Sequence, residues 1–143
     1  MSATALDTSV LVAGLCSWHE SHANTLRALG AADKRGELIV PAPALVEAYS
    51  VMTRLPAPHR LAPQDAQEIL SRSFEERSSV VGLTGAETWR LVRDAAGGGV
   101  AGGATYDALI LACARKARAD RLLTLDLKDF LRLAPDDIEI LAP

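Results

Sequence analysis

Cysteine is scarce in this sequence, and long hydrophobic runs are missing. The two cysteines, Cys16 and Cys113, sit among apolar neighbours, where a reduced, buried thiol is the commoner state, so we expect no disulfide. No apolar run approaches the roughly 18–20 residues that a membrane span needs, and no basic region followed by a long apolar one opens the chain. We therefore expect a cytoplasmic protein that does not enter a membrane.

An excess of positive charge is also lacking. Fifteen Lys and Arg against eighteen Asp and Glu give a net charge of -3, which excludes a protein that coats nucleic acid through bulk charge, so any nucleic-acid site must be local. The apolar fraction of 49% and the charged fraction of 23% are ordinary globular values. With 143 residues, we expect a single domain over residues 1–143.

Strand and helix patterns alternate along the chain. Short apolar runs predict strands at residues 4–6, 38–40, 79–83, 122–125 and 138–141. Helical spacing and capping residues predict helices at residues 10–15, 19–32, 44–55, from Pro63 onward, 84–96, 105–119 with Thr105 as cap, and 128–131. This alternation predicts an α/β fold, a three-layer α/β/α sandwich with a mainly parallel central sheet.

Carboxylates follow two of the predicted strands. Asp7 ends the first strand and Asp126 ends the strand at 122–125. In parallel α/β sheets ligands collect at the carboxyl ends of strands, so both acids share one crevice if those strands are neighbours, which we assume here. Two further acids stand in apolar surroundings: Asp107, which opens a helix after a glycine stretch, and Glu47, within a helical pattern.

Each acid also has a purely structural interpretation. Asp7 and Asp107 could simply stabilise helix N-termini, without any further role, and Asp126 could be an ordinary turn residue. Glu47, among Leu45, Val46 and Tyr49, needs either solvent or a partner. The four acids together are stronger evidence for a functional site than any one of them.

A divalent cation would reconcile four converging carboxylates. Uncompensated, they repel each other and some take up protons. All-oxygen ligands with waters left in the shell suit Mg²⁺ or Mn²⁺, and such sites usually recruit a phosphate. The predicted chemistry is metal-assisted phosphodiester hydrolysis, in which the ion activates a water, orients the phosphate and neutralises the developing charge.

Four segments in this order carry a family resemblance, namely Ala5–Leu11, the helical Glu47, Tyr106–Ile110 and Leu123–Phe130. Together they resemble the PIN-domain ribonucleases, and among these the VapC-type toxins of bacterial toxin–antitoxin pairs. The resemblance extends from Thr4 to about Leu133. It implies an Mg²⁺- or Mn²⁺-dependent endoribonuclease that cleaves RNA, is held inactive by a cognate antitoxin and often pairs as a homodimer.

The resemblance also assigns roles to single positions. It places the four catalytic, metal-binding acids at Asp7, Glu47, Asp107 and Asp126, although Asp129 competes for the fourth place. Hydroxyls that bond the acids or their bound water correspond to Thr8 or Ser9 and to Thr124. The glycine stretch from Gly97 to Gly103 departs from the family pattern and leaves the substrate entrance undefined.

Other patterns compete with this interpretation. Residues 97–102 contain a formal G-x-G-x-x-G, but it follows a predicted helix instead of a strand. Cys16, His19 and His22 have zinc-like spacing without an evident fourth ligand. A phosphohydrolase with Asp7 as covalent nucleophile would want a second Asp where Ser9 stands. The main alternative is a non-catalytic PIN-fold module that binds RNA or a protein.

Two contact surfaces are suggested by the remaining residues. The helical apolar positions Val12, Leu15, Leu45 and Tyr49 could line a groove for an amphipathic antitoxin segment, from which an Arg or Lys would reach the acids. Basic residues that could bind RNA phosphates near the crevice are Arg54, Arg60, Arg72, Arg77, Arg115, Lys116, Arg118 and Lys128.

Overall fold

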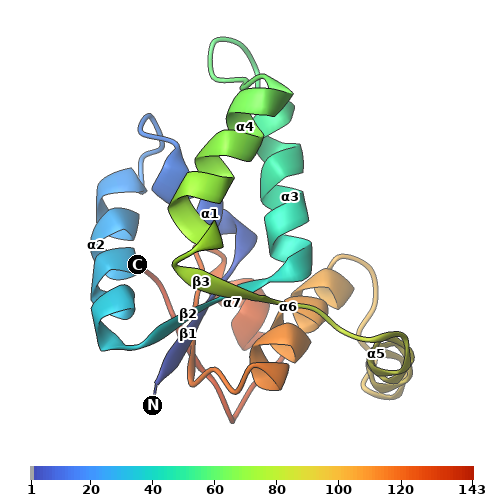
Figure 1. Ribbon diagram of the computed structural model, residues 1–143. Helices are drawn as coiled ribbons and strands as arrows, with labels where there is room; N and C mark the ends of the chain where they lie inside the picture. Colours follow the sequence, from blue (N-terminus) through green and yellow to red (C-terminus); the bar gives the residue numbers. More distant parts are fainter. Residues whose placement is uncertain (1) are drawn as a thin grey trace.

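The computed structural model describes residues 2–143, and its centre is a five-stranded parallel sheet (Figure 1). The strands are β1 (Ala3–Leu6), β2 (Glu37–Pro41), β3 (Ser78–Val81), β4 (Arg121–Leu123) and β5 (Glu139–Leu141). They lie in the order β3-β2-β1-β4-β5, and every neighbouring pair is parallel. The expectation of a mainly parallel sheet is therefore confirmed.

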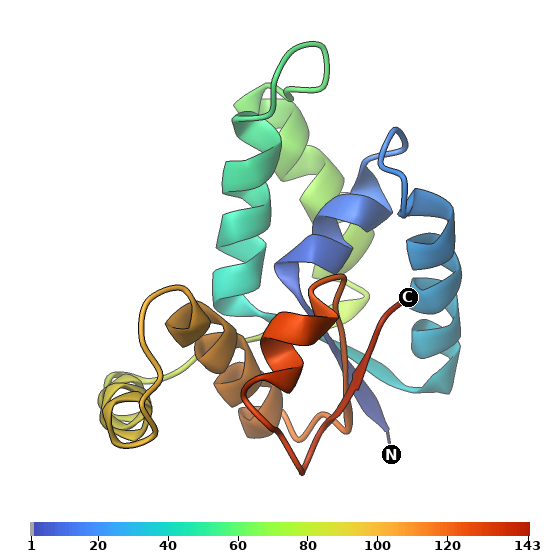
Figure 2. The same cartoon turned by 180° about the vertical axis from the view of Figure 1, so that it is seen from behind.

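Helices connect these strands. They are α1 (Thr8–Leu15), α2 (His22–Arg35), α3 (Ala42–Thr53), α4 (Pro63–Leu70), α5 (Gly85–Gly97), α6 (Ala104–Lys116) and α7 (Leu127–Leu131), and a π-helical turn, Ser71–Glu75, extends α4. In both views α1 to α4 lie together, whereas α5 stands to the side next to α6 (Figures 1 and 2). Within residues 2–143 no helix is long and apolar enough to cross a membrane.

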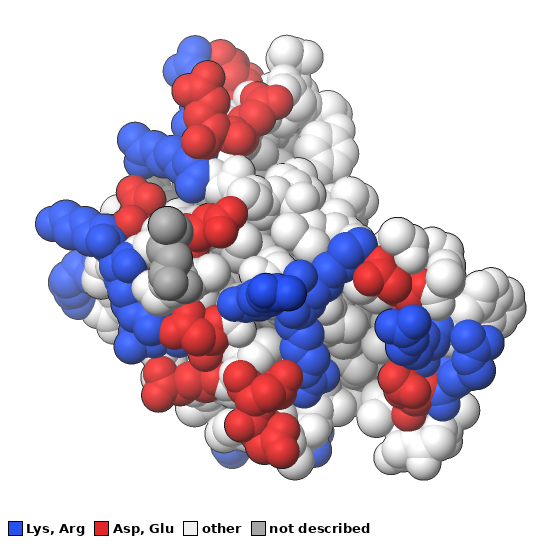
Figure 3. All heavy atoms as spheres, turned by 60° about the horizontal axis from the view of Figure 1, so that its bottom comes forward, with Lys and Arg blue, Asp and Glu red and all other residues white. Residues whose placement is uncertain are grey.

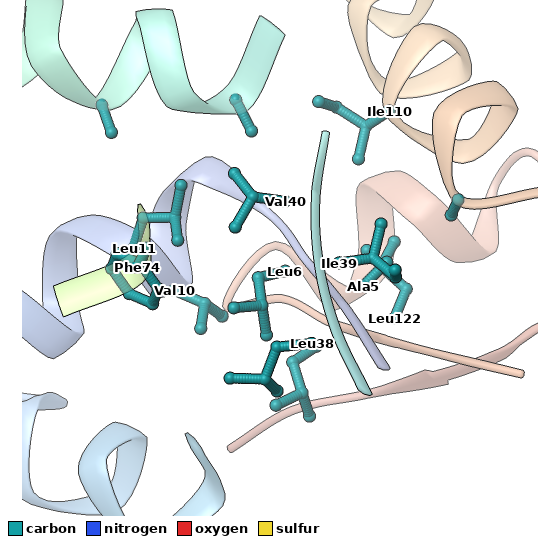
Figure 4. Close-up of a cluster of buried hydrophobic side chains, with 14 of the residues drawn as sticks. Ala5, Leu6, Val10, Leu11, Leu38, Ile39, Val40, Phe74, Ile110 and Leu122 are labelled. Atoms are coloured by element: carbon teal, nitrogen blue, oxygen red, sulfur yellow. The ribbon is translucent and has the colours of Figure 1, made fainter. Parts of the chain in front are cut away.

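The central strands β1, β2 and β4 are largely buried on both faces, as expected for a parallel sheet between two layers of helices. Ala5 is paired in register with Ile39 of β2 and with Leu122 of β4. This row points toward Ile110 of α6, whereas Leu6, Leu38 and Val40 point the other way. There they meet the side chains of Val10, Leu11 and Phe74 (Figure 4). The predicted three-layer sandwich is thus confirmed.

Two predicted helix starts were wrong. Residues 19–21 are not helical, because the His19 N–H donates to the Cys16 carbonyl at 3.0 Å and the His22 N–H to the His19 carbonyl at 3.0 Å, so turns occupy this stretch before α2 begins at His22. Thr105 is not the cap of α6. Its N–H already donates to the Gly102 carbonyl at 3.0 Å, and the helix begins one residue earlier.

Local signals elsewhere were correct. Thr84 and Glu87 form the predicted capping box, in which the Glu87 N–H donates to the Thr84 hydroxyl at 3.2 Å and the Thr84 N–H to the Glu87 carboxylate at 2.8 Å. The cysteines Cys16 and Cys113 are buried free thiols, as expected. In the glycine stretch, Gly99 and Gly102 adopt φ of 73° and 62°, a region in which a side chain is strained.

The surface charges are mixed in sign. On the face formed by the bottom of Figure 1, Lys and Arg alternate with Asp and Glu over most of the charged area (Figure 3). A broad basic surface for nucleic acid is not visible on this face. This pattern agrees with the sequence expectation that any nucleic-acid site is local.

Candidate active site

The carboxyl ends of β1 and β4 lie side by side. Leu6 is paired with Leu123, and the Asp7 N–H donates to the Leu123 carbonyl at 3.0 Å. The two strands are therefore neighbours, as the sequence analysis assumed. Asp7 and Asp126 consequently emerge from the same edge of the sheet, where α1 and α7 begin.

All four candidate acids line one pocket of about 620 Å³. Asp7 comes from the end of β1, Glu47 from α3, Asp107 from α6 and Asp126 from the start of α7. The four helices α1, α3, α6 and α7 approach one another in this region (Figure 2). The other side chains that line the pocket include Thr8, Ser9, Val12, His19, Val51, Tyr106, Ile110, Asp129 and Arg132.

Asp7 is the most deeply buried of these acids, with 5% of its surface exposed. Its Oδ2 accepts two hydroxyl hydrogen bonds, from Ser9 Oγ at 2.8 Å and from Thr124 Oγ1 at 2.8 Å. A buried carboxylate is costly unless such donors solvate it. The hydroxyls therefore keep Asp7 in one orientation at the pocket wall.

The same hydroxyls connect Asp7 to the chain that follows β4. Ser9 Oγ accepts the Leu125 N–H at 3.0 Å, and Thr124 Oγ1 accepts the Asp126 N–H at 2.9 Å. Both expected hydroxyl positions thus bond to an acid. Thr8 instead donates to Glu47 Oε2 at 3.3 Å, which connects α1 to α3.

The electrostatics of the pocket reflect its crowded negative charge. Desolvation, followed by the negative charges of Asp7, Asp129, Asp126 and Glu47, raises the pKa of the half-buried Asp107 to about 6. Desolvation raises the pKa of Asp7 most, and the Glu47 charge adds to it, while hydrogen bonds from Ser9, Thr124 and the Thr8 backbone act in the opposite direction. Desolvation and the charges of Asp7 and Asp129 raise the pKa of Asp126.

The donor chemistry of this pocket fits a hard divalent cation. The acids offer only oxygen, and positive charge among them would offset the negative charge that, after desolvation, raises the pKa of Asp107. As they stand, no three His, Cys, Asp or Glu side chains in residues 2–143 are close enough to hold one ion. Mg²⁺ usually keeps several waters and binds through one or two carboxylates, so such a site does not need three side chains in contact with the ion.

Several pocket residues were missed by the sequence analysis. Arg132, whose guanidinium lies 3.7 Å from the Asp129 carboxylate, lines the pocket together with His19, Tyr106 and Gly103. The spacing of Asp129 and Arg132, one helical turn apart just after Asp126, was a signal that could have found this pair. The glycine stretch reaches the pocket wall through Gly103.

Some sequence expectations are corrected by the structure. None of the basic residues suggested as RNA contacts is among the side chains that line the acidic pocket within residues 2–143. The suggested antitoxin positions do not share one groove: Val12 lines the acidic pocket, Leu15 a pocket beside α2, and Leu45 and Tyr49 an apolar pocket beside β3.

Asp107 makes the stability of the metal-free protein depend on pH. Because its folded pKa of about 6 lies above the ordinary Asp value of 3.8, the folded state binds more protons than the unfolded state between these values, and stability falls as pH rises from about 4 to 6. We expect Asp107→Asn to raise Tm at pH 7 by roughly 2–4 °C, the effect of about 1 kcal/mol on a domain of this size, since solvent screens a half-buried carboxylate.

Thermal unfolding in EDTA between pH 4 and pH 7.5 measures this effect. The difference between variant and parent should shrink toward pH 4, and Asp33→Asn, at an exposed position on α2, serves as the matched control. Parallel pH profiles for Asp107→Asn and its parent would contradict the assignment of this penalty to Asp107.

Comparison with known proteins supports a common origin. A family model described as the PIN domain matches residues 4–135. Ribonuclease VapC40 of Mycobacterium tuberculosis (strain ATCC 25618 / H37Rv) is 45% identical over 122 residues, which are 85% of each chain. Ribonuclease VapC27 of the same strain is 39% identical over 116 residues, which are 81% of this chain and 80% of VapC27.

Solved structures share the fold at low sequence identity. VapC20 of Mycobacterium tuberculosis, described as a sarcin–ricin loop cleaving toxin, matches with a TM-score of 0.74 at 15% identity and covers 95% of this chain and 98% of its own. VapBC2 of Rickettsia felis, bound to a DNA fragment from its promoter, matches with a TM-score of 0.67 at 19% identity, over 99% and 98% of the two chains.

These comparisons agree with the arrangement of the molecule itself. The parallel sheet, the acids at the ends of β1 and β4 and the family match over most of the chain all lead to one assignment. The chain belongs to the PIN-domain family, among the VapC proteins.

Proposed function

We propose that this protein is a metal-dependent endoribonuclease and the toxin of a type II toxin–antitoxin pair. The observation that carries the proposal is the convergence of Asp7, Glu47, Asp107 and Asp126 on one pocket at the carboxyl ends of β1 and β4. The relatives VapC40 and VapC27, which are named ribonucleases, support the same activity. RNA is thus the proposed substrate.

Asp7, Glu47, Asp107 and Asp126 would hold the metal ion, and we assign it as Mg²⁺ or Mn²⁺ because the donor set is entirely carboxylate oxygen. When bound, the ion activates a water, orients the phosphate and neutralises the charge that develops on the leaving oxygen. The PIN family membership of the chain supports this dependence on a divalent ion.

The protein's own groups prepare this site. Ser9 and Thr124 donate to the same oxygen of Asp7, which favours its ionised form and fixes its direction. Asp107, with a pKa raised to about 6, is largely ionised at pH 7 and becomes protonated in more acidic solution. Acidification therefore removes ligand charge from the pocket, and the activity should decline below about pH 6.

Asp126 is the stronger candidate for the fourth acid. Its backbone N–H donates to Thr124 Oγ1, the hydroxyl that also donates to Asp7, so Asp126 belongs to the hydrogen-bond network of the pocket. Asp129 faces the Arg132 guanidinium at 3.7 Å, which partly neutralises its charge. We assign Asp129 to the rim of the pocket, where it modulates the other acids and holds Arg132 near the path of an RNA phosphate.

The proposed regulatory partner is a cognate antitoxin. VapC20, a fold neighbour, is described as a toxin, and the negative pocket of this chain would attract a basic side chain from such a partner. Copurification of a co-expressed neighbouring protein tests the pairing separately from the nuclease activity. Cytoplasmic location, expected from the lack of a membrane-type run, and homodimer formation, implied by the family resemblance, remain predictions.

The test is cleavage of a mixed pool of structured RNAs by antitoxin-free protein in Mg²⁺ or Mn²⁺. We expect discrete products that disappear in EDTA and in Asp7→Asn. RNA that is retained without being cut, by folded protein in the presence of metal, would contradict the nuclease and favour a binding module. Products that persist in EDTA would contradict the metal site.

A further inference from the structure

Two exposed aromatic side chains stack on each other near the acidic pocket. The rings of Trp18 and His59 have centroids 4.2 Å apart and planes 24° apart. Trp18 is still 45% exposed, and His59 is exposed as well. The stacked pair leaves an aromatic surface open to solvent, which is the kind of surface that binds ligands.

The stack continues from the wall of the pocket. Trp18 lies in the loop after α1 and His59 in the loop after α3, and both loops lie at the same end of the molecule (Figures 1 and 2). Next to Trp18, His19 lines the acidic pocket, and its ring is 5.9 Å from the Trp18 ring. Glu47 lines the pocket, and Thr53 ends α3 just before the loop that carries His59. The helical rise between these two residues is about 9 Å. Two to three stacked nucleotides at about 3.4 Å each span that length.

Hydrogen bonds hold both loops in place. In the second loop, Arg60 Nε donates to the Leu55 carbonyl at 2.8 Å, and the His59 N–H donates to the Pro56 carbonyl at 3.0 Å. In the first loop, the Ser21 N–H donates to His19 Nδ1 at 3.0 Å. The aromatic pair is therefore preorganised, so a ligand that stacks on it loses little affinity to ordering of the protein.

The polar groups around the stack suit a phosphate backbone. Arg54 and Arg60 are exposed in the second loop, and the remaining guanidinium nitrogens of Arg60 are available after its bond to Leu55. Because His19 Nδ1 accepts a hydrogen bond, the neutral ring carries its proton on Nε2, where it can be donated. Glu20 is the one acidic residue in the two loops.

We propose that Trp18, supported by His59, is a stacking platform for an unpaired base of the RNA strand that passes through the acidic pocket. Stacking on an aromatic face is tolerant of sequence, whereas Arg60 and His19 would bind the adjoining phosphates. The platform rests on the proposed ribonuclease function, which it deepens by adding a subsite for single-stranded RNA. It selects for strands that can release a base from a helix.

Trp18 fluorescence reports stacking directly. In Asp107→Asn/Trp89→Phe, which leaves Trp18 as the single tryptophan and slows cleavage, we expect oligoadenylate and oligouridylate RNA to quench the emission saturably. RNA that binds without quenching would overturn the platform. This readout also holds if a Trp18 variant fails to fold, since it needs no change at that position.

Substitution provides the second readout. Trp18→Ala in the Asp107→Asn background should weaken oligonucleotide binding by about 5- to 150-fold, the effect of losing one stacked base. Trp18→Phe should restore much of it, and Trp89→Ala, at a tryptophan 65% exposed on α5, should leave the affinity unchanged. Equal affinity of Trp18→Ala and its parent would overturn the proposal.

The outcomes separate the platform from the nuclease. Metal-dependent cleavage with a KM unchanged by Trp18→Ala would refute the platform and leave the ribonuclease intact. In another outcome, the protein that keeps Asp107 binds RNA through Trp18, with quenching, and yet cleaves none. That result would support the platform and refute the ribonuclease. Loss of antitoxin binding in Trp18→Ala with RNA binding intact would overturn the RNA assignment in favour of a protein partner.

Discussion

Asp107→Asn is expected to lower kcat/KM for metal-dependent RNA cleavage by about 10²–10³-fold, the scale on which removal of one preorganised electrostatic contact acts. The change keeps the size of the side chain but removes one negative charge from the pocket that Asp7, Asp126 and Glu47 share. In metal-free protein the same change relieves repulsion. The variant should therefore be more stable and less active, a trade-off typical of functional sites.

A matched set of measurements makes this prediction decisive. Initial rates at several metal concentrations separate weaker ion binding from slower chemistry, and Asp33→Asn on α2 controls for the loss of a carboxylate elsewhere. Divalent ions should raise Tm of the parent, because ligands that bind the folded state stabilise it, and should raise Tm of Asp107→Asn much less. Cleavage at the parental rate by Asp107→Asn would remove this residue from the site.

Phe130→Ala is expected to lower the free energy of unfolding by about 3–5 kcal/mol and Tm by roughly 6–20 °C. Phe130 is the largest of the fully buried side chains, with 0% of its surface exposed, and it belongs to the central core. Its removal leaves a cavity that the surrounding elements cannot close fully. Urea denaturation measures the loss, and an unchanged m-value would show that the native and unfolded states keep their compactness.

The neighbouring Leu131 supplies the control for this substitution. It lies in the same helix but is 52% exposed, so Leu131→Ala should change the free energy of unfolding by well under about 1 kcal/mol. Because α7 (Leu127–Leu131) also carries Asp129 and follows Asp126, Phe130→Ala should weaken cleavage even at temperatures where it is folded. Equal stability of the two variants would contradict the observed packing of α7.

Much of the fold could be predicted from local patterns. The apolar runs at β1, β2 and β4 are short and bounded by turn or capping residues, and the capping box of Thr84 and Glu87 marks the start of α5 in sequence as in structure. The predictions failed at residues 19–21 and at Thr105, where turns compete with the first helical hydrogen bonds. One or two hydrogen bonds decide whether a turn or the first turn of a helix forms there, and hydrophobic periodicity does not reveal them.

The candidate site was predictable only in part. The residue order around Asp7, Glu47, Asp107 and Asp126 suffices to nominate these acids, but their catalytic and metal-binding roles remain a proposal. Their convergence required the pairing of β1 with β4, which the sequence could only assume. Arg132 was missed although its spacing from Asp129 was a local signal, whereas the stack of Trp18 on His59 joins two loops far apart in the sequence and left no such signal.

By itself, the sequence determined the alternation of strands and helices, the absence of long membrane-type runs and the identity of four acids suited to a divalent ion. These properties are local, because hydrophobic periodicity, capping and side-chain chemistry act over a few residues. Only the tertiary structure decided that Ser9 and Thr124 share one oxygen of Asp7, that desolvation and the charges of neighbouring acids raise the pKa of Asp107, and that Trp18 meets His59. Desolvation, Coulomb repulsion and ring stacking depend on distances in space, which strand order and helix packing set between residues far apart in the chain.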